Sequence, residues 1–184
     1  MTVVPEVQAL SKSLVLTLIA PDQPGLVEAL SQALTDHGGN WLQSRMSHLA
    51  GQFAGILSCT VPGDRSEAFL GALRELESRG LRFTVEGSGE APAATTEARS
   101  FHLELVGNDR PGIVREISHA LAQRGVNVEE LDTECTSAPM TGETLFKAEA
   151  RLSVPTTADL DALRRDLEAI ANDLMVELAL AEAE

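Results

Sequence analysis

Asp109-Arg110-Pro111-Gly112-Ile113-Val114, near the middle of the chain, has a counterpart near its start, Asp22-Gln23-Pro24-Gly25-Leu26-Val27. The two copies lie 87 positions apart, and at this offset residues 14–40 and 101–127 align without a gap and share 11 identical positions. Self-similarity at a fixed offset is typical of a duplicated structural unit. The sequence therefore predicts that one small module occurs twice.

The duplication divides the 184 residues into two domains. We predict an N-terminal tail over residues 1–11, a first domain over 12–87, a linker over 88–98 and a second domain over 99–184. The linker is rich in Gly, Ser, Ala and Thr, a composition typical of flexible connections. Each domain is small but long enough to bury one hydrophobic core.

Charge and composition disfavour several functions. The formal net charge is −14, from 28 acidic and 14 basic residues. Nucleic acids and anionic membranes are bound through positive charge, so direct binding to either is disfavoured. No apolar run reaches the roughly 18 to 20 residues that cross a bilayer, and the N-terminus lacks the basic start of a signal peptide. We expect a cytoplasmic protein that contacts neither nucleic acid nor membrane directly.

Both copies show the same order of elements, βαββαβ. Alternating leucines indicate the first strands, and apolar residues at helical spacing indicate the helices, with Leu26, Val27, Leu30 and Leu34 on one stripe. The predicted strands cover residues 14–20, 40–49, 53–61, 81–86, 101–105, 146–154 and 174–180. The first predicted helix runs from residue 26 to the glycines at 38 and 39. The other predicted helices cover residues 66–79, 111–124 and 158–172. This order predicts an α+β fold of two ferredoxin-like domains in tandem, with both helices on one sheet face and the first and third strands central.

The cysteines and histidines indicate neither a metal site nor a catalytic site. Cys59 and Cys135 occupy non-equivalent positions and form no CxxC pair, which in a cytosolic chain favours reduced, buried thiols. The four histidines show no metal-ligand spacing. No Ser/His/Asp, Cys/His or paired-Glu set recurs in convergent positions. We therefore expect no catalysis, no metal and no cofactor.

The repeated Asp-x-Pro-Gly motif lies on the turn from first strand to first helix. Proline suits the first position of a helix, and glycine lets a ligand approach the backbone closely. The N–H groups of residues 25–27 and 112–114 then point out of the helix and favour a carboxylate. Alternatively, Asp22 and Asp109 cap their helices and turns. Both interpretations remain open.

Asn40 and Asn127 follow the glycines Gly38 and Gly125, where the chain leaves the first helix. Asparagine at such a position is either a turn residue or a side-chain amide that reaches a ligand held at the other loop. The two copies differ here and at the first turn. Pro21 stands where the second copy has Asn108, and Trp41 stands where it has Val128.

With the βαββαβ order, the Asp-(Gln/Arg)-Pro-Gly-(Leu/Ile)-Val turn and the Gly-x-Asn after the helix, the chain resembles a tandem pair of ACT domains. The segment Ala138-Pro139-Met140-Thr141-Gly142-Glu143-Thr144-Leu145-Phe146 resembles the second ACT domain of the glycine cleavage system transcriptional repressor family. The resemblance covers roughly residues 12–182. It implies amino-acid sensing, control of transcription through a partner transcription factor, and no catalysis.

The resemblance also implies which residues bind the ligand, because ACT domains use the first strand–helix loop and the start of the second strand. These positions are Asp22, Pro24, Gly25, Leu26 and Asn40 in the first copy, and Asn108, Asp109, Arg110, Pro111, Gly112, Ile113 and Asn127 in the second. The second copy is the better candidate, since Asn108 and Arg110 add polar groups. The ligand would be a small amino acid, with glycine as one candidate.

Two functions remain open from the sequence: a ligand-responsive regulator of glycine cleavage genes, and a ligand-independent protein-interaction module of two ACT domains. The second copy carries six extra residues that fall around residues 137–143, and this loop forms either a surface insertion or a partner contact. Exposed sheet edges on such small domains favour side-by-side pairing, within the chain or in a homodimer.

Overall fold

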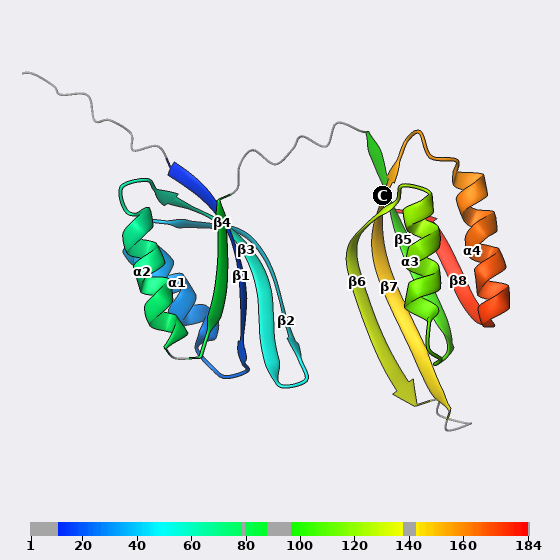
Figure 1. Cartoon of the computed structure of the whole chain (residues 1–184), viewed down its shortest axis with the longest axis horizontal. Helices are drawn as coiled ribbons and strands as arrows, with labels where there is room; N and C mark the ends of the chain where they lie inside the picture. Colours follow the sequence, from blue (N-terminus) through cyan, green and yellow to red (C-terminus); the bar gives the residue numbers. More distant parts are fainter. Residues whose placement is uncertain (1–10, 79, 88–96, 138–142, 184) are drawn as a thin grey trace, which may run out of the picture. The chain divides into compact units, whose positions relative to one another are not determined.

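The chain folds into two compact units that divide between Ala93 and Ala94. The computed structural model describes residues 11–78, 80–87, 97–137 and 143–183. Residues 1–10 of the predicted N-terminal tail, residues 88–96 of the linker and residues 138–142 of the 137–143 segment lie outside these residues. Figure 1 shows that each unit is a single sheet with both of its helices on one face, as the element order predicts.

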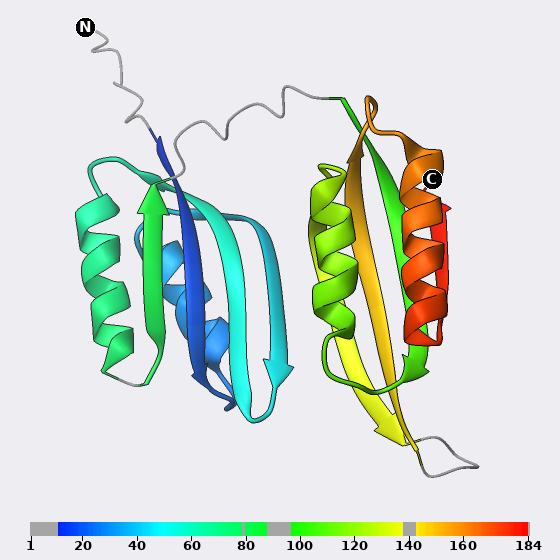
Figure 2. The same cartoon turned by 45° about the vertical axis from the view of Figure 1, so that its right-hand side comes forward.

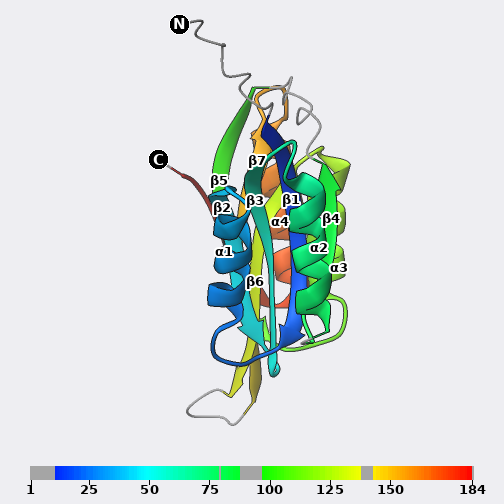
Figure 3. The same ribbon diagram turned by 90° about the vertical axis from the view of Figure 1, so that its left-hand side faces the viewer.

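The first domain has the βαββαβ order, and its sheet is antiparallel with strand order β2-β3-β1-β4. Figure 3 shows its two helices side by side on the same face. The elements are β1 (Ser11–Pro21), α1 (Leu26–Asp36), β2 (Asn40–Leu49), β3 (Gln52–Pro62), α2 (Ser66–Glu77) and β4 (Arg82–Gly87). The first and third strands are central, as predicted, and β2 and β4 are the edges.

The second domain repeats this topology with strand order β6-β7-β5-β8 (Figure 2). Its elements are β5 (Ala98–Asn108), α3 (Ile113–Gln123), β6 (Asn127–Ser137), β7 (Thr144–Pro155), α4 (Leu160–Leu174) and β8 (Val176–Glu182). The predicted last strand begins two residues too early, because α4 continues through Leu174. Met175 then ends the helix in the left-handed conformation, with φ 52°.

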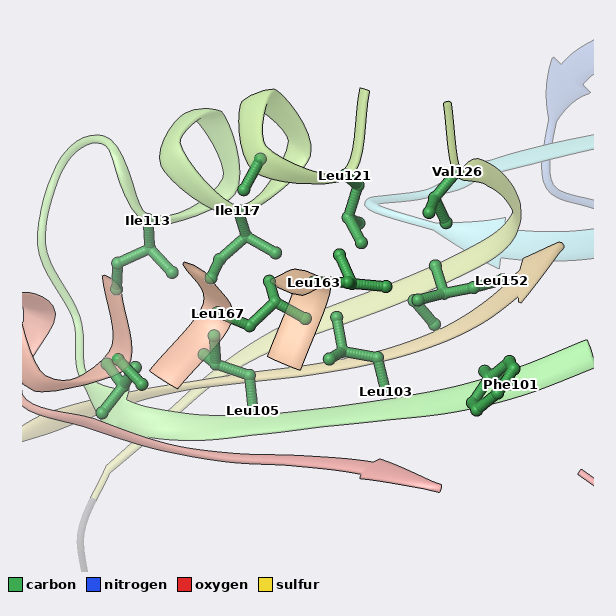
Figure 4. Packing of buried hydrophobic residues seen from close by; sticks show 14 of the residues in the cluster. Phe101, Leu103, Leu105, Ile113, Ile117, Leu121, Val126, Leu152, Leu163 and Leu167 are labelled. Carbon is green, nitrogen blue, oxygen red and sulfur yellow. The ribbon is translucent and has the colours of Figure 1, made fainter. Parts of the chain in front are cut away.

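Each domain has its own core between sheet and helices. In the second domain, Ile117 and Leu121 of α3 and Leu163 and Leu167 of α4 point toward Leu103 and its neighbours on the sheet (Figure 4). In the first, Leu16, Leu30 and Phe69 are almost fully buried. Amphipathic periodicity therefore predicts both cores, since alternate strand residues and one helical stripe face inward.

Two predictions about burial are wrong. Val27 is 46% exposed, because it lies beside the buried stripe of Leu26, Leu30 and Leu34 rather than on it. Cys135 is exposed, because β6 is an edge strand, although both cysteines are free as expected. Cys59, on the central strand β3, is fully buried, and this burial raises the pKa of its thiol to about 11.

Candidate functional site

The Asp-x-Pro-Gly loops are held against the neighbouring hairpin in both domains. The Asp22 amide donates to the Gly51 carbonyl at 3.0 Å, and the Asp109 amide donates to the Thr144 carbonyl at 2.8 Å. These bonds continue the pairing of the central strand past its last residue. The loop therefore lies beside the start of the third strand, at one end of each sheet.

A glycine precedes the first helical residue in each loop, with a left-handed conformation that L residues rarely adopt. Gly25 has φ 90° and Gly112 has φ 102°. Their carbonyls accept the first helical bonds, from the amides of Ala29 and Glu116, each at 2.9 Å. The turn thus requires glycine for its own geometry, whether or not a ligand approaches.

The two aspartates do not cap the helices. The N-cap residues are Gly25 and Gly112, and neither helix has a side-chain cap hydrogen bond. The helix-capping interpretation of Asp22 and Asp109 is therefore wrong, because each aspartate lies three residues before the cap. Both side chains are exposed, and an Asp22 carboxylate oxygen lies 3.8 Å from Nε2 of His48.

The first-domain loop borders an open hollow of about 250 Å³. Its lining combines the exposed carboxylates of Asp22 and Glu28 with the apolar side chains of Leu26 and Phe53. The backbone N–H groups at the start of α1 carry positive partial charge beside it. An amino acid carries an ammonium and a carboxylate group. The carboxylates of this hollow are opposite in charge to the ammonium, and the positive N–H groups are opposite to the carboxylate.

Arg110 of the second loop has an internal partner. Its Nη2 donates to the Asp173 carbonyl at 2.9 Å, near the end of α4, where carbonyls lack helical partners. Its Nε is buried and has no hydrogen-bond partner within the described structure. Arg110 therefore ties the loop to α4, a role that its position in the motif did not reveal. Asn108 ends β5 opposite Leu145 and is exposed.

Asn40 and Asn127 lie at the opposite end of their domains from the loops. Asn40 pairs with Thr60, which pairs with Ser13 at the start of β1, whereas the loop follows Pro21. The eight residue steps from Ser13 to Pro21 span about 27 Å. In the second domain, Asn127 pairs with Ser153, which pairs with Ser100 near the start of β5, whereas the loop follows Asn108 at its end. One domain alone therefore does not bring the predicted ligand residues together.

The second domain also has an apolar groove between α3 and β6, which the sequence did not predict. Val114, Val128 and Leu131 line it, and each is at least 36% exposed; among its lining residues only Ser118 is polar. The volume of this groove is about 40 Å³. In the first domain, Trp41 and Met46 pack against the core at the equivalent strand. Val128, at the position equivalent to Trp41, has a smaller side chain.

The ACT domain model matches residues 12–86, and a second ACT domain model matches residues 95–176. The chain belongs to the ACT domain family and carries two ACT domains in tandem. A comparison with curated proteins finds no match.

Two solved structures resemble nearly the whole chain. A protein of unknown function from Galdieria sulphuraria is 28% identical, with a TM-score of 0.84 over 95% of this chain and 99% of that one. A second, described as a "putative glycine cleavage system transcriptional repressor", is 19% identical, with a TM-score of 0.68 over 95% and 99%. At that identity the second likeness shows the fold alone.

Two further findings bear on the site. In the part of the chain that the structure describes, no group of three or more His, Cys, Asp or Glu side chains is placed to hold a metal ion. No helix in those residues is long and apolar enough to cross a membrane.

Proposed function

We propose that this protein is a non-catalytic regulator that binds a small amino acid at its Asp-x-Pro-Gly loops, with glycine as the first candidate. The observation that carries the proposal is the hollow beside Asp22, where exposed carboxylates, an apolar wall and a helix N-terminus face one small space. The same loop geometry recurs at Asp109.

The full site needs a second ACT domain. Asn40 and the loop lie at opposite ends of one domain, so an ACT domain paired antiparallel along the open edge would bring its own asparagine to this loop. The exposed edge strands β2 and β6 offer unpaired backbone groups for such pairing. A ligand held between two domains binds the paired arrangement more tightly than the separate one, which is the condition for allosteric control.

The regulated process is transcription of glycine cleavage genes, through a partner transcription factor in the cytoplasm. The sequence resemblance to the glycine cleavage repressor family supports this assignment. The net charge of −14 supports an indirect route, because a strongly anionic chain repels DNA. Purified protein should leave promoter DNA unshifted and should shift it only together with the partner.

The direct test is calorimetry with a panel of amino acids on the full chain. One small amino acid should release or absorb heat and raise the melting temperature, and Asp22→Ala should weaken its binding about tenfold, the loss of one charge-assisted contact. Asp64→Ala is the matched control, because Asp64 is an exposed aspartate in the other strand-to-helix turn of the same domain. No response to any amino acid at millimolar concentration would refute sensing.

The apolar groove favours a second candidate, a ligand-independent interaction module. Its lining offers one hydroxyl, from Ser118, and no charged group for a zwitterionic ligand, so it suits an apolar protein surface. Under this alternative, assembly with a partner would be the same with and without every amino acid in the panel. Amino-acid-dependent assembly would exclude it.

A further inference from the structure

The outer face of the first sheet, which is the face away from its helices, is uncharged at its centre. On the central strands β1 and β3, the side chains of this face alternate with the buried ones. They are those of Val15, Thr17, Ile19, Ala54, Ile56 and Ser58. A sheet face that meets water normally carries polar side chains, whereas four of these six are apolar and that of Ile56 is 46% exposed.

The second domain carries ionisable residues at the equivalent positions. The first strands align at the offset of 87, and the third strands align at 93, where Val61-Pro62 matches Val154-Pro155. The pairing agrees, since Thr17 lies opposite Ile56 and Glu104 lies opposite Glu149. Five of the six positions differ in this way: His102 for Val15, Glu104 for Thr17, Lys147 for Ala54, Glu149 for Ile56 and Arg151 for Ser58. The fold therefore accepts charge on this face, and the first domain does without it.

An uncharged centre is what a covered face requires, because removing an unpaired charge from water is unfavourable. Within the described part of the first domain, the charged side chains of this face belong to the edge strands. They are Arg45 on β2 and Arg82 and Glu86 on β4. A protein interface has this composition, with an apolar core and a polar rim.

The relief of the face also suits a second sheet. One open hollow lies beside Thr17 and is lined in part by Ile19 and Ala54. Another lies beside Ile56 and is lined in part by Val15 and Ser58. Two sheets that pack face to face interdigitate their side chains, so hollows of this kind can receive the side chains of a second sheet.

Among the outer sheet faces of this chain, the same face on a second copy is the suitable partner. The outer face of the second domain would bring Glu104 and Glu149 against apolar side chains, and burying them without a cation is unfavourable. Two copies of the first face, by contrast, oppose no charges at their centres, whichever way the two sheets are turned. The edge-strand charges then stay at the rim, in contact with water.

The size of the face is enough for a weak dimer. Its four strands, at spacings of about 4.8 Å, cover about 19 Å across, and the eight residue steps from Ser13 to Pro21 cover about 27 Å along. Two such faces would bury about 1,000 Å², close to the lower limit for specific protein interfaces. We therefore expect association that depends on protein concentration.

We propose that two copies of the protein pack through the outer faces of their first sheets, with Thr17 and Ile56 at the centre of the contact. The arrangement is a two-sheet sandwich, with the helices of each copy on the far side of its sheet. A twofold axis relates the copies, so each contributes the same residues. The contact does not involve a ligand at the Asp-x-Pro-Gly loops, and the inference therefore goes beyond the proposed function and stands independently of it.

A charge introduced at the centre tests the packing. In analytical ultracentrifugation of the full chain, Ile56→Glu should lower the mass of the assembly by half, because both copies would bury the added carboxylate. The variant should fold, since Glu149 occupies the equivalent position, and circular dichroism checks this. Ala68→Glu adds the same charge at an exposed position of α2 and should keep the wild-type mass. A monomeric wild type, or an unchanged mass for Ile56→Glu, overturns the proposal.

A thiol placed on the face provides a second test that does not depend on mass. Thr17 and Glu104 are exposed at equivalent positions of the two outer faces. A thiol reagent should label Thr17→Cys about tenfold more slowly at concentrations where the dimer forms than at high dilution. Glu104→Cys is the matched control and should be labelled at the same rate at both. Mass spectrometry of the labelled peptides separates each new thiol from Cys135.

Two labelling results would contradict the proposal. Equal rates for Thr17→Cys at both concentrations would show that the face stays open to water. Protection that persists at high dilution would show that another part of the same chain covers it. Neither test contains an amino acid, so a dimer that binds no amino acid would sustain this inference while refuting the proposed sensing.

Discussion

Gly25→Ala and Gly71→Ala make the same chemical change in one domain and should shift its stability in opposite directions. Gly25 has φ 90°, a conformation that costs an L residue about 1–2 kcal/mol. The nearest atom to an added Cβ is Oε2 of Glu28, at 4.0 Å, so no steric clash adds to this cost. Gly71 lies within α2, with no atom within 4 Å of the Cβ position, and alanine there should stabilise by about 0.5–1 kcal/mol.

Thermal denaturation of the full chain, followed by circular dichroism, measures the difference. Domains of this size shift their melting temperature by about 4–8 °C per kcal/mol, so the two variants should melt at clearly different temperatures. Because the two domains can unfold separately, the first-domain transition is identified by the fluorescence of Trp41, the single tryptophan. If Gly25→Ala were neutral, the loop would not depend on the left-handed glycine and would adapt to an ordinary residue.

Three further predictions follow from particular contacts. Cys135 should react at once with a thiol reagent at neutral pH, whereas Cys59 should react only on unfolding, because it is buried and its pKa is about 11; equal rates would contradict the fold. Arg124→Ala should destabilise the second domain by about 1 kcal/mol, measured by denaturation, because Arg124 Nε and Nη2 lie 2.8 and 2.6 Å from one Asp166 oxygen and join α3 to α4. Arg110→Met should lower stability similarly through the lost bond to the Asp173 carbonyl; if instead it weakened only amino-acid binding, Arg110 would belong to the ligand site.

The spacing of apolar residues predicted the fold because the buried residues of each domain follow the strand and helix periods. Strand alternation at Leu103 and Leu105 and the helical stripe at Ile117 and Leu121 correspond to the buried positions. The boundaries that the sequence missed depend on backbone conformation rather than hydrophobicity. The α4 end at Met175, with its positive φ, has no glycine to mark it.

The candidate site was predicted less fully, because its residues come from two ends of the domain. The motif located the loops, yet only strand register shows that Asn40 and Pro21 lie at opposite ends of the sheet. Arg110 was expected to favour ligand binding, but its bond to Asp173 depends on where α4 ends, which the sequence did not reveal. The groove went unnoticed because Leu131 is an apolar residue whose exposure depends on the edge position of β6.

The two copies of the domain differ in sequence at their edge strands β2 and β6. The 11 identities include the buried Leu16/Leu103 and Leu34/Leu121 pairs and the Asp-x-Pro-Gly loop, so core and loop are shared. From Trp41 to Leu49, by contrast, no residue matches its counterpart at the same offset. The residues that pack in each core are constrained by that packing, and the exposed residues of an edge strand are not. The core and the loop therefore keep the same residues in both copies, whereas the edge strands β2 and β6 have diverged, with Arg45 in one copy where Asp132 stands in the other.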